Sequence, residues 1–380
     1  MKNLTTTARS RGFGIVEIMV AMAIALIGMI VIFQVFAVAE GVNRTAVNGS
    51  DAQQNGAYAM YMLQQEVRQA GWGFNTSQAM GCAALAYNAA LAGPPAALTP
   101  AAQMPAGSPA GSYLLAPVVI EPGPANGSDT LEVNFGNETL LVAPVTLFAN
   151  QVTTTDPFNV GNRYGFAVGD LILAIEPNKA CTLAQVTALP AAPTTTITRA
   201  VGGAYPFNKP GGSGVIYTTN GALLDLGPAP TRDVFSVVNN QLTVIPTLTS
   251  NAAQVVADNI VQLKVQYGMD NGGADPSLPG PHTANDGIID TYTTVVPATS
   301  QAWNQMLTVR IGLVARSAEP EKPSGAGPGC DTTTVTPTWS GSTGATPNPF
   351  NLTANAQWQC YRYKVFETVI PIKNILWTQG

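Results

Sequence analysis

The feature that most constrains how this 380-residue chain folds is an unbroken apolar segment at residues 13–39. Glu17 is its only ionisable residue. The segment exceeds the roughly 20 residues that a helix needs to cross a bilayer. Three basic residues and no acid precede it, which predicts a single pass with a cytoplasmic N-terminus and an exported remainder. A cleaved secretory signal has a shorter apolar core, so we interpret the segment as a membrane-spanning helix.

The composition excludes several classes of protein. Charged residues make up 10 % of the chain, against about a quarter in an average soluble domain. The chain is 46 % hydrophobic with a formal net charge of −5, which is too apolar and too weakly charged for intrinsic disorder. It contains no Lys/Arg-rich cluster, so no nucleic-acid partner is expected.

Glu17 is anomalous because a carboxylate inside an apolar span is costly, and such residues usually serve a function. One interpretation is an interfacial glutamate that reaches the lipid headgroups. The other is a carboxylate that needs a cationic partner held close to it. A free α-amino group on a neighbouring chain would satisfy the second.

Residues 12–21, GFGIVEIMVA, resemble the class III signal of type IV pilins and pseudopilins. The resemblance implies that 1–12 is a leader cleaved after Gly12 by a prepilin peptidase. It also implies N-methylation of Phe13 and contact of Glu17 with the N-terminal amine of an adjacent subunit during assembly. Gly14 departs from the family pattern, in which Thr or Ser is commoner, but its small size is not expected to block processing.

Residues 40–70 contain no proline and predict a continuation of the same helix, so we expect one helix over 13–71. Small and apolar residues recur on one face at helical spacing, namely Ala46, Gly49, Ala52, Gly56, Ala57, Met60, Leu63 and Val67. Gly71 is a suitable C-terminal stop. Residues 54–72 resemble the minor pilin subfamily PilW.

From residue 72 onward, short β-like runs alternate with Gly, Pro, Asn and Asp. The predicted strands lie near 113–121, 130–135, 139–147, 170–176, 214–219, 233–238, 241–245, 260–269, 307–317 and 361–372. Residues 89–112 and 319–350 are expected to form long surface loops. The predicted class is therefore α+β: a long N-terminal helix packed on a large, β-rich pilin-type domain at 72–380.

The C-terminal part, 254–376, also resembles PilW-type sequences. Residues 256–270 resemble their strand pattern ending in V-x-Y-G-x-D, and residues 286–292 resemble D-G-x-x-D-x-Y. Residues 303–317 and 361–374 resemble the two elements that follow. The middle of the chain, 80–250, resembles no family that we can name and is predicted to be the variable part.

All four cysteines lie beyond the apolar segment, in the predicted oxidising compartment, and none has metal-site spacing. Four cysteines allow three pairings. We favour Cys330–Cys360, because this bond would tie the 319–350 loop to the last strand and contribute about 3–4 kcal/mol. Cys82–Cys181 then follows by elimination.

Four aspartates cluster in the sequence, Asp270, Asp275, Asp286 and Asp290, with Asn271 and Asn285 among them. Oxygen ligands on a loop suit calcium, so these residues are candidate metal ligands. The alternative is ordinary turn chemistry, because Asp, Asn and Gly are common turn residues. No other cofactor is expected.

The chain shows no catalytic motif, and we expect it not to be an enzyme. His282, its only histidine, is predicted to lie in a solvated loop. The alternative is a membrane-anchored enzyme in which scattered carboxylates form a glycosidase pair.

The resemblance implies a minor pilin in the complex that primes or tips a type IV pilus, supporting pilus biogenesis, twitching and adhesion. Implied partners are other minor and major pilins, a tip adhesin, the prepilin peptidase and the inner-membrane assembly platform. The implied location is the bacterial inner membrane and then the pilus at the cell surface, with the C-terminal domain periplasmic or extracellular. A J-like pseudopilin of type II secretion and a tip-located adhesin or binding module remain as alternatives.

Overall fold

The computed structural model describes Gly12 and residues 14–74, 76–91, 103–124, 127–140, 143–202, 204–321 and 329–376. Phe13 and the leader before Gly12 lie outside the described residues. The chain divides into two compact units, Met1–Asp51 and Ala52–Gly380. The last third of the first helix, from Ala52 onward, thus belongs to the β-rich unit.

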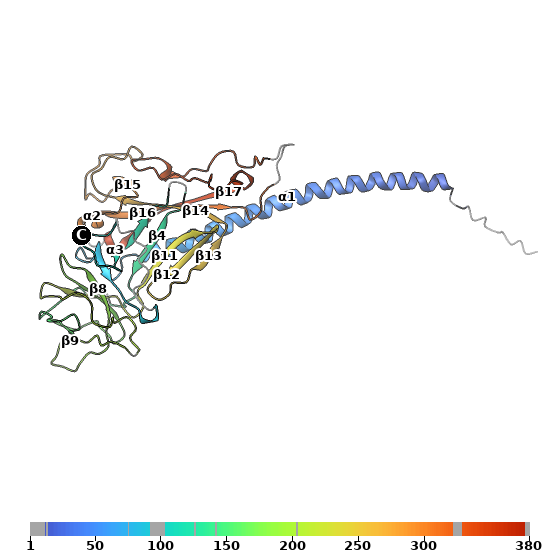
Figure 1. Cartoon of the computed structure of the whole chain (residues 1–380). Helices are drawn as coiled ribbons and strands as arrows, with labels where there is room; N and C mark the ends of the chain where they lie inside the picture. The colour runs from blue at the N-terminus through green and yellow to red at the C-terminus, as the bar shows by residue number, and fades with distance from the viewer. Residues whose placement is uncertain are drawn as a thin grey trace, which may run out of the picture. The chain divides into compact units, whose positions relative to one another are not determined.

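Helix α1 occupies Ile15–Gln69 and confirms the long helix predicted from the proline-free sequence (Figure 1). Its 55 residues correspond to a length of about 80 Å at about 1.5 Å per residue. The stretch Ile15–Gly41 has a mean hydropathy of 2.8 and is fully exposed. By length and composition, this stretch can cross a membrane.

From Ala52 onward, α1 packs within the second unit through the predicted stripe of small and apolar residues. Its buried members include Ala52, Met60, Leu63 and Val67. Gly56 lies against the Phe366 ring, so close that a Cβ added at this position would lie 2.0 Å from it. Gln64 Nε2 donates a hydrogen bond of 2.9 Å to Thr368 Oγ1.

The end of α1 is fixed by contacts with distant parts of the chain. Gly71 adopts a left-handed conformation, with φ of +82°, which confirms the predicted stop. Its N–H donates to the carbonyl oxygen of Asn134 at 2.8 Å. Asn374 Nδ2 donates to the carbonyl oxygens of Gln69 and Ala70, at 3.1 and 2.9 Å. These contacts satisfy backbone groups that a helix end leaves unpaired.

The C-terminal region forms a four-stranded antiparallel sheet in the order β15-β14-β16-β17 (Figure 1). Its strands are β14 (Ile260–Met269), β15 (Thr291–Thr293), β16 (Met306–Arg316) and β17 (Tyr363–Pro371). Phe366 and Thr368, which α1 contacts, lie on β17. The strands predicted at 260–269, 307–317 and 361–372 are confirmed within two residues at each end.

A second, five-stranded sheet has the order β13-β12-β11-β4-β3. Its strands are β3 (Val118–Glu121), β4 (Thr130–Phe135), β11 (Thr231–Val238), β12 (Gln241–Pro246) and β13 (Gln254–Asp258). One apolar cluster joins Leu63 of α1 to Leu131 and Phe235 of this sheet and to Leu263 and Ile311 of the C-terminal sheet. The helix and both sheets thus share one core.

The middle of the chain contributes a six-stranded sheet in the order β2-β1-β8-β7-β10-β5. Its strands are β1 (Cys82–Leu85), β2 (Tyr113–Leu115), β5 (Val145–Thr146), β7 (Leu171–Ile175), β8 (Cys181–Gln185) and β10 (Ala222–Asp225). A further pair joins β6 (Phe158–Asn159) to β9 (Thr196–Ile197). This region has two apolar clusters of its own.

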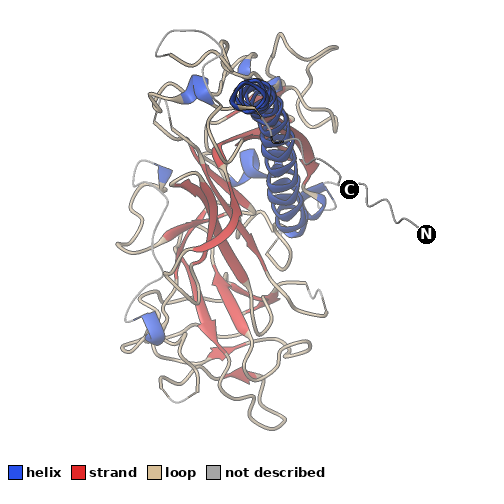
Figure 2. Ribbon diagram, turned by 90° about the vertical axis from the view of Figure 1, so that its right-hand side faces the viewer, coloured by secondary structure: helices blue, strands red, loops and turns tan. Residues whose placement is uncertain are grey.

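Short helical turns complete the fold: η1 (Ala89–Leu91), α2 (Ser300–Asn304), η3 (Ser340–Ser342), η4 (Trp358–Cys360) and α3 (Lys373–Leu376). Strands form the interior of the second unit and loops most of its periphery (Figure 2). The predicted α+β class is confirmed.

One predicted strand of the middle region is wrong, because residues 214–219 form no strand. The strand predicted at 139–147 is shorter than expected: among its described residues, only Val145–Thr146 form one. Strands β1, β6, β8, β9 and β10 were not predicted.

The loop predicted at the surface over 319–350 is partly buried. Trp339 is 6 % exposed, and an added Cβ at Gly312 of β16 would lie 2.5 Å from its ring. Trp339 forms a small apolar cluster with Val314 and Phe350, and its Nε1 donates to the Asn348 carbonyl oxygen at 2.8 Å. The expectation of a surface loop at 319–350 is therefore corrected, because the large side chain of Trp339 anchors this loop on the sheet. Of the other loop, 89–112, residues 92–102 lie outside the described part of the chain.

Candidate functional site

The predicted processing and assembly residues lie at the start of α1. Gly12 and Gly14 precede the helix and are exposed, and Phe13 lies outside the described residues. Gly14 donates its N–H to Glu17 Oε2 at 3.3 Å. The carboxylate therefore satisfies one of the N–H groups that a helix start leaves free, and its charge suits the positive end of the helix dipole.

The surroundings of Glu17 are apolar. Ile15, Val16, Ile18, Met19 and Val20 all have exposed side chains, from 46 % to 79 %. In a membrane or a packed helical bundle this surface would be covered, and a charged carboxylate would need a partner there. The single N–H from Gly14 leaves acceptor capacity on both oxygens.

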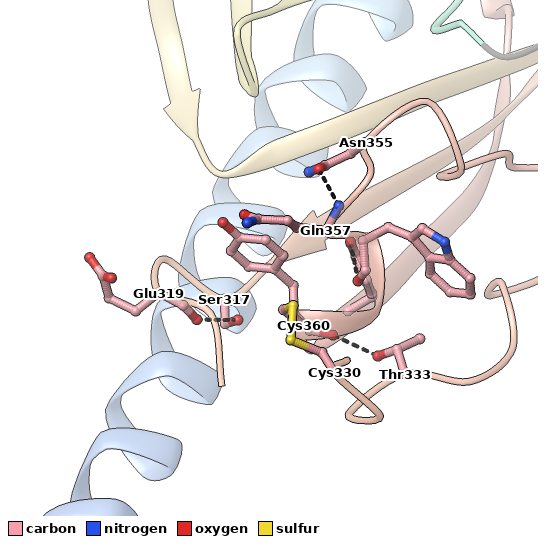
Figure 3. Close-up of a disulfide and its surroundings, with 10 residues drawn as sticks. Ser317, Glu319, Cys330, Thr333, Asn355, Gln357 and Cys360 are labelled. Carbon is pink, nitrogen blue, oxygen red and sulfur yellow. Dashed lines mark hydrogen bonds between the residues drawn. A yellow bond between two sulfur atoms is a disulfide. The ribbon is translucent and has the colours of Figure 1, made fainter. Parts of the chain in front are cut away.

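Cys330 and Cys360 form the predicted disulfide, with a Cα–Cα distance of 4.8 Å (Figure 3). Cys360 ends the short turn η4, and the bond closes a segment of 30 residues. Thr333 holds the same region, since its Oγ1 donates to the Tyr361 carbonyl oxygen at 2.6 Å. Gln357 donates its N–H to Asn355 Oδ1 at 2.9 Å, which shapes the turn before Cys360 (Figure 3).

Cys82 and Cys181 form the second disulfide and confirm the pairing reached by elimination. They lie on β1 and β8, which pair in parallel with Ala84 opposite Cys181, and their Cα atoms are 6.0 Å apart. The bond connects positions 99 residues apart. Within the described residues no cysteine is free.

Three of the four predicted metal ligands come together. Asp270 directly follows β14 and Asp290 directly precedes β15, where Met269 pairs with Thr291. Asp286 lies in the loop between them. Each aspartate offers one oxygen, and these oxygens lie within 4.8 Å of one another. Asp270 and Asp290 are fully buried, and Asp286 is exposed. We refer to these residues as the aspartate triad.

Comparison with known families gives two matches on this chain. Residues 7–33 match the family described as the prokaryotic N-terminal methylation motif, and residues 235–374 match the one described as type IV pilus-assembly protein W, PilW. No curated protein and no solved structure is detectably similar to the chain. The chain is a PilW-type pilin. The likeness expected over 254–376 is confirmed, and the likeness expected over 54–72 lies outside both matches.

The match to the N-terminal methylation motif indicates the role of α1 in the pilin. A methylation motif followed by an exposed apolar helix anchors the protein in a membrane, from which pilins assemble into surface filaments. Within the pilin, the PilW match covers β12, β13 and the whole four-stranded sheet, and it includes the aspartate triad.

Asp275, the fourth predicted ligand, lies outside the aspartate triad of the pilin. Its Oδ1 accepts from Ser277 N and Oγ, and its Oδ2 accepts from Tyr292 N at 3.3 Å. Burial opposes the charge of Asp275, but these hydrogen bonds outweigh it and hold its pKa below the usual value. Asp275 therefore holds the loop against β15.

His282 is not the solvated side chain that the sequence indicated. Its side chain is 16 % exposed, and its Nδ1 lies 3.5 Å from Asp290 Oδ1. The loop folds back between these positions and brings the imidazole to the edge of the triad.

No sequence pattern indicated the buried charges of the pilin. Arg232 on β11 pairs with Glu132 on β4, with Nη2 to Oε2 at 2.8 Å, and its guanidinium stacks over Tyr113. Glu138 is 8 % exposed and lies against Gly73 and Gly136. Burial raises the pKa of Glu138 to about 7, and the nearby charge of Asp225 adds to this effect.

The middle region of the pilin holds a cavity of about 230 Å³ beside β8. Arg199 lines it, but its guanidinium donates to the carbonyl oxygens of Thr154 and Asp156 and lies over the Phe158 ring. Its charge thus serves to hold loops together.

Proposed function

We propose that this chain is a minor pilin that enters a type IV pilus through its N-terminal helix, in the complex that primes or tips the fibre. The observation that carries the proposal is the presence of both the methylation motif and the PilW region on one chain.

The exposed apolar helix supports this mechanism. The same surface that lipid covers before assembly would be covered by neighbouring helices in a fibre. After cleavage at Gly12, a new α-amino group would form on Phe13, close to Glu17. We infer that Glu17 then exchanges its own Gly14 N–H for the amine of an adjacent subunit, since an ion pair is much stronger in an apolar setting than in water.

The proposed partners are other minor and major pilins, a tip adhesin, the prepilin peptidase and the inner-membrane platform. The proposed topology has a cytoplasmic leader and an exported second unit, and the two disulfides fit an oxidising compartment. We assign contacts with surfaces or a tip adhesin to the middle sheet, which lies outside the PilW match.

Glu17→Gln tests the mechanism, because it removes the charge and keeps the size of the side chain. The variant should still be cleaved, methylated and held in the membrane. It should be at least tenfold depleted from sheared pili, because a lost buried ion pair costs about 3 kcal/mol or more. Intact-mass analysis reports processing, and immunoblots of sheared pili report incorporation.

Glu40→Gln is the matched control, since Glu40 is an exposed carboxylate on the same helix. It should enter pili at the wild-type level. Wild-type incorporation of Glu17→Gln would overturn the amine-pairing mechanism. Deletion of the gene should abolish surface pili and twitching; retained pili with failed enzyme export would instead assign the chain to a type II secretion filament.

A further inference from the structure

The aspartate triad leaves one buried oxygen without a hydrogen bond. Asp290 is fully buried, and its Oδ2 accepts from Gly272 N at 2.5 Å. Its Oδ1 is also buried and has no hydrogen-bond partner. His282 Nδ1 lies 3.5 Å from Oδ1, which is too far for a good hydrogen bond. A buried carboxylate oxygen without a hydrogen bond is costly, so its position calls for a cation.

Asp270 differs from Asp290 in being largely satisfied. Its oxygens accept from the N–H groups of Asn285, Asp286 and Gly287, at 2.5, 3.2 and 2.7 Å. These bonds hold the chain around Asp286 beside the two buried carboxylates. Hydrogen bonds within a turn therefore account for the burial of the Asp270 carboxylate, but they do not account for the buried Asp290 Oδ1.

Asp286 contributes a third negative charge to the same place. Its Oδ1 accepts from Ile288 N at 2.9 Å, so the carboxylate is oriented by its own turn. The three carboxylates lie within 4.8 Å of one another and repel, most strongly between the two buried ones, Asp270 and Asp290. Among the described ion pairs, the one that involves the triad joins Asp290 to His282 at 3.5 Å.

We propose that the aspartate triad binds one calcium ion, which joins the end of β14 to the start of β15 through the loop at 271–289. The donors are carboxylate oxygens on a loop with one exposed side, which suits a hard cation with flexible coordination and open positions for water. His282 Nδ1 lies 3.5 Å from Asp290 Oδ1, but the triad itself offers carboxylate oxygens, and this donor set favours calcium over a transition metal. This proposal does not depend on assembly into a pilus.

The test uses the full chain purified in detergent and stripped with a chelator. Adding calcium should raise the melting temperature in a concentration-dependent way, since a ligand that binds the folded state stabilises it. Isothermal titration should give one calcium per chain, and hydrogen exchange of the amides at 271–289 should slow. Magnesium at the same concentration should produce a smaller shift.

Two variants make the test specific. Asp286→Asn keeps an oxygen for the Ile288 N–H and is exposed, so it should fold and yet weaken calcium binding at least tenfold. Asp290→Asn should abolish binding. Asp258→Asn, at an exposed carboxylate on β13, is the matched control and should bind calcium as the wild type does.

Several results would overturn the proposal. They are an unchanged melting temperature with calcium, a full calcium shift in Asp286→Asn, and an equal shift with magnesium. Preferential binding of zinc that disappears in His282→Gln would identify a transition-metal site instead.

Discussion

Glu138 shows how a buried carboxyl group contributes to the pH dependence of stability. Its pKa is raised to about 7, mainly by burial, whereas an ordinary glutamate titrates near 4.5. Below pH 4.5 the group is protonated in both the folded and the unfolded chain. Between these values the unfolded chain loses the proton first, so this contribution to stability falls as the pH rises and is gone above about pH 7.

Glu138→Gln should therefore stabilise the protein at pH 8 by about 1–3 kcal/mol and leave stability at pH 4.5 nearly unchanged. The amide keeps the shape of the protonated acid and cannot ionise. Chemical denaturation of the full chain in detergent, at both pH values, measures the difference.

Asp156 provides a control of opposite sign. Its pKa is lowered, mainly by the hydrogen bond from the Thr153 side chain, so its contribution is present at neutral pH and is lost on acidification. Asp156→Asn should be destabilising at neutral pH and neutral at acidic pH. An equal gain from Glu138→Gln at both pH values would show that the effect comes from packing instead of ionisation.

At the scale of elements, α1 and β17 approach closely because position 56 has no side chain. A Cβ at Gly56 would lie 2.0 Å from Phe366, whereas a Cβ at Gly49 would have no neighbour within 4 Å. Gly56→Ala should destabilise the second unit by about 1–3 kcal/mol through overpacking. Gly49→Ala should be neutral or stabilising by up to about 1 kcal/mol, from helix propensity alone.

Thermal and chemical denaturation of both variants in detergent checks this pair. If Gly56→Ala stabilised the protein as much as Gly49→Ala, the Phe366 ring would be free to move aside. Phe366 is half-buried, so this outcome is a real alternative.

The elements that the sequence predicted well have a clear local pattern. α1 follows from a proline-free helical stripe, and β14 and β16 are long runs rich in β-branched residues. β8, with the sequence CTLAQ, is buried on both faces and shows no alternation that would distinguish it. β10, ALLD, has residues of low strand propensity and is held by its neighbours.

The wrong strand at 214–219 has a different cause. Tyr217 is buried, as the pattern suggested, but its N–H donates to Gln151 Oε1 at 3.1 Å. The N–H of Thr218 donates to Glu176 Oε2 at 2.8 Å. Side chains distant in sequence thus replace a neighbouring strand, and no local rule anticipates them.

The residues of the candidate site also divide into those that local sequence could place and those that it could not. The cysteine pairs were predictable from their positions in the chain and the predicted oxidising compartment, whereas the role of Glu17 stays a prediction. Asp275 and His282 were misplaced because both lie in one long loop whose folding depends on contacts with β15 and Asp290.

At the scale of the whole molecule, the two disulfides constrain different lengths of chain. Cys82→Ala with Cys181→Ala should lower the free energy of unfolding by about 4–5 kcal/mol, because it frees the longer segment and removes a buried bond. Cys330→Ala with Cys360→Ala should cost about 3–4 kcal/mol. Denaturation under non-reducing conditions measures both, and mass spectrometry confirms that the remaining bond is intact.

Limited proteolysis separates local from global effects of the same variants. Loss of Cys330–Cys360 should expose the chain near 330–360 to cleavage while the middle sheet stays resistant. Equal sensitivity of the middle sheet would show that this bond stabilises the entire second unit.

The contact of Asn374 with the end of α1 has a consequence for biosynthesis. Asn374 reaches Ala70 across 304 residues of sequence, and β17 supplies the surface on which Gly56 rests. In a nascent chain, the end of the first helix therefore cannot be capped, or the helix packed on β17, until the final segment has been synthesised. Premature termination before residue 363 would leave that helix without its edge strand, so quality-control proteases should clear such fragments quickly and spare the complete product.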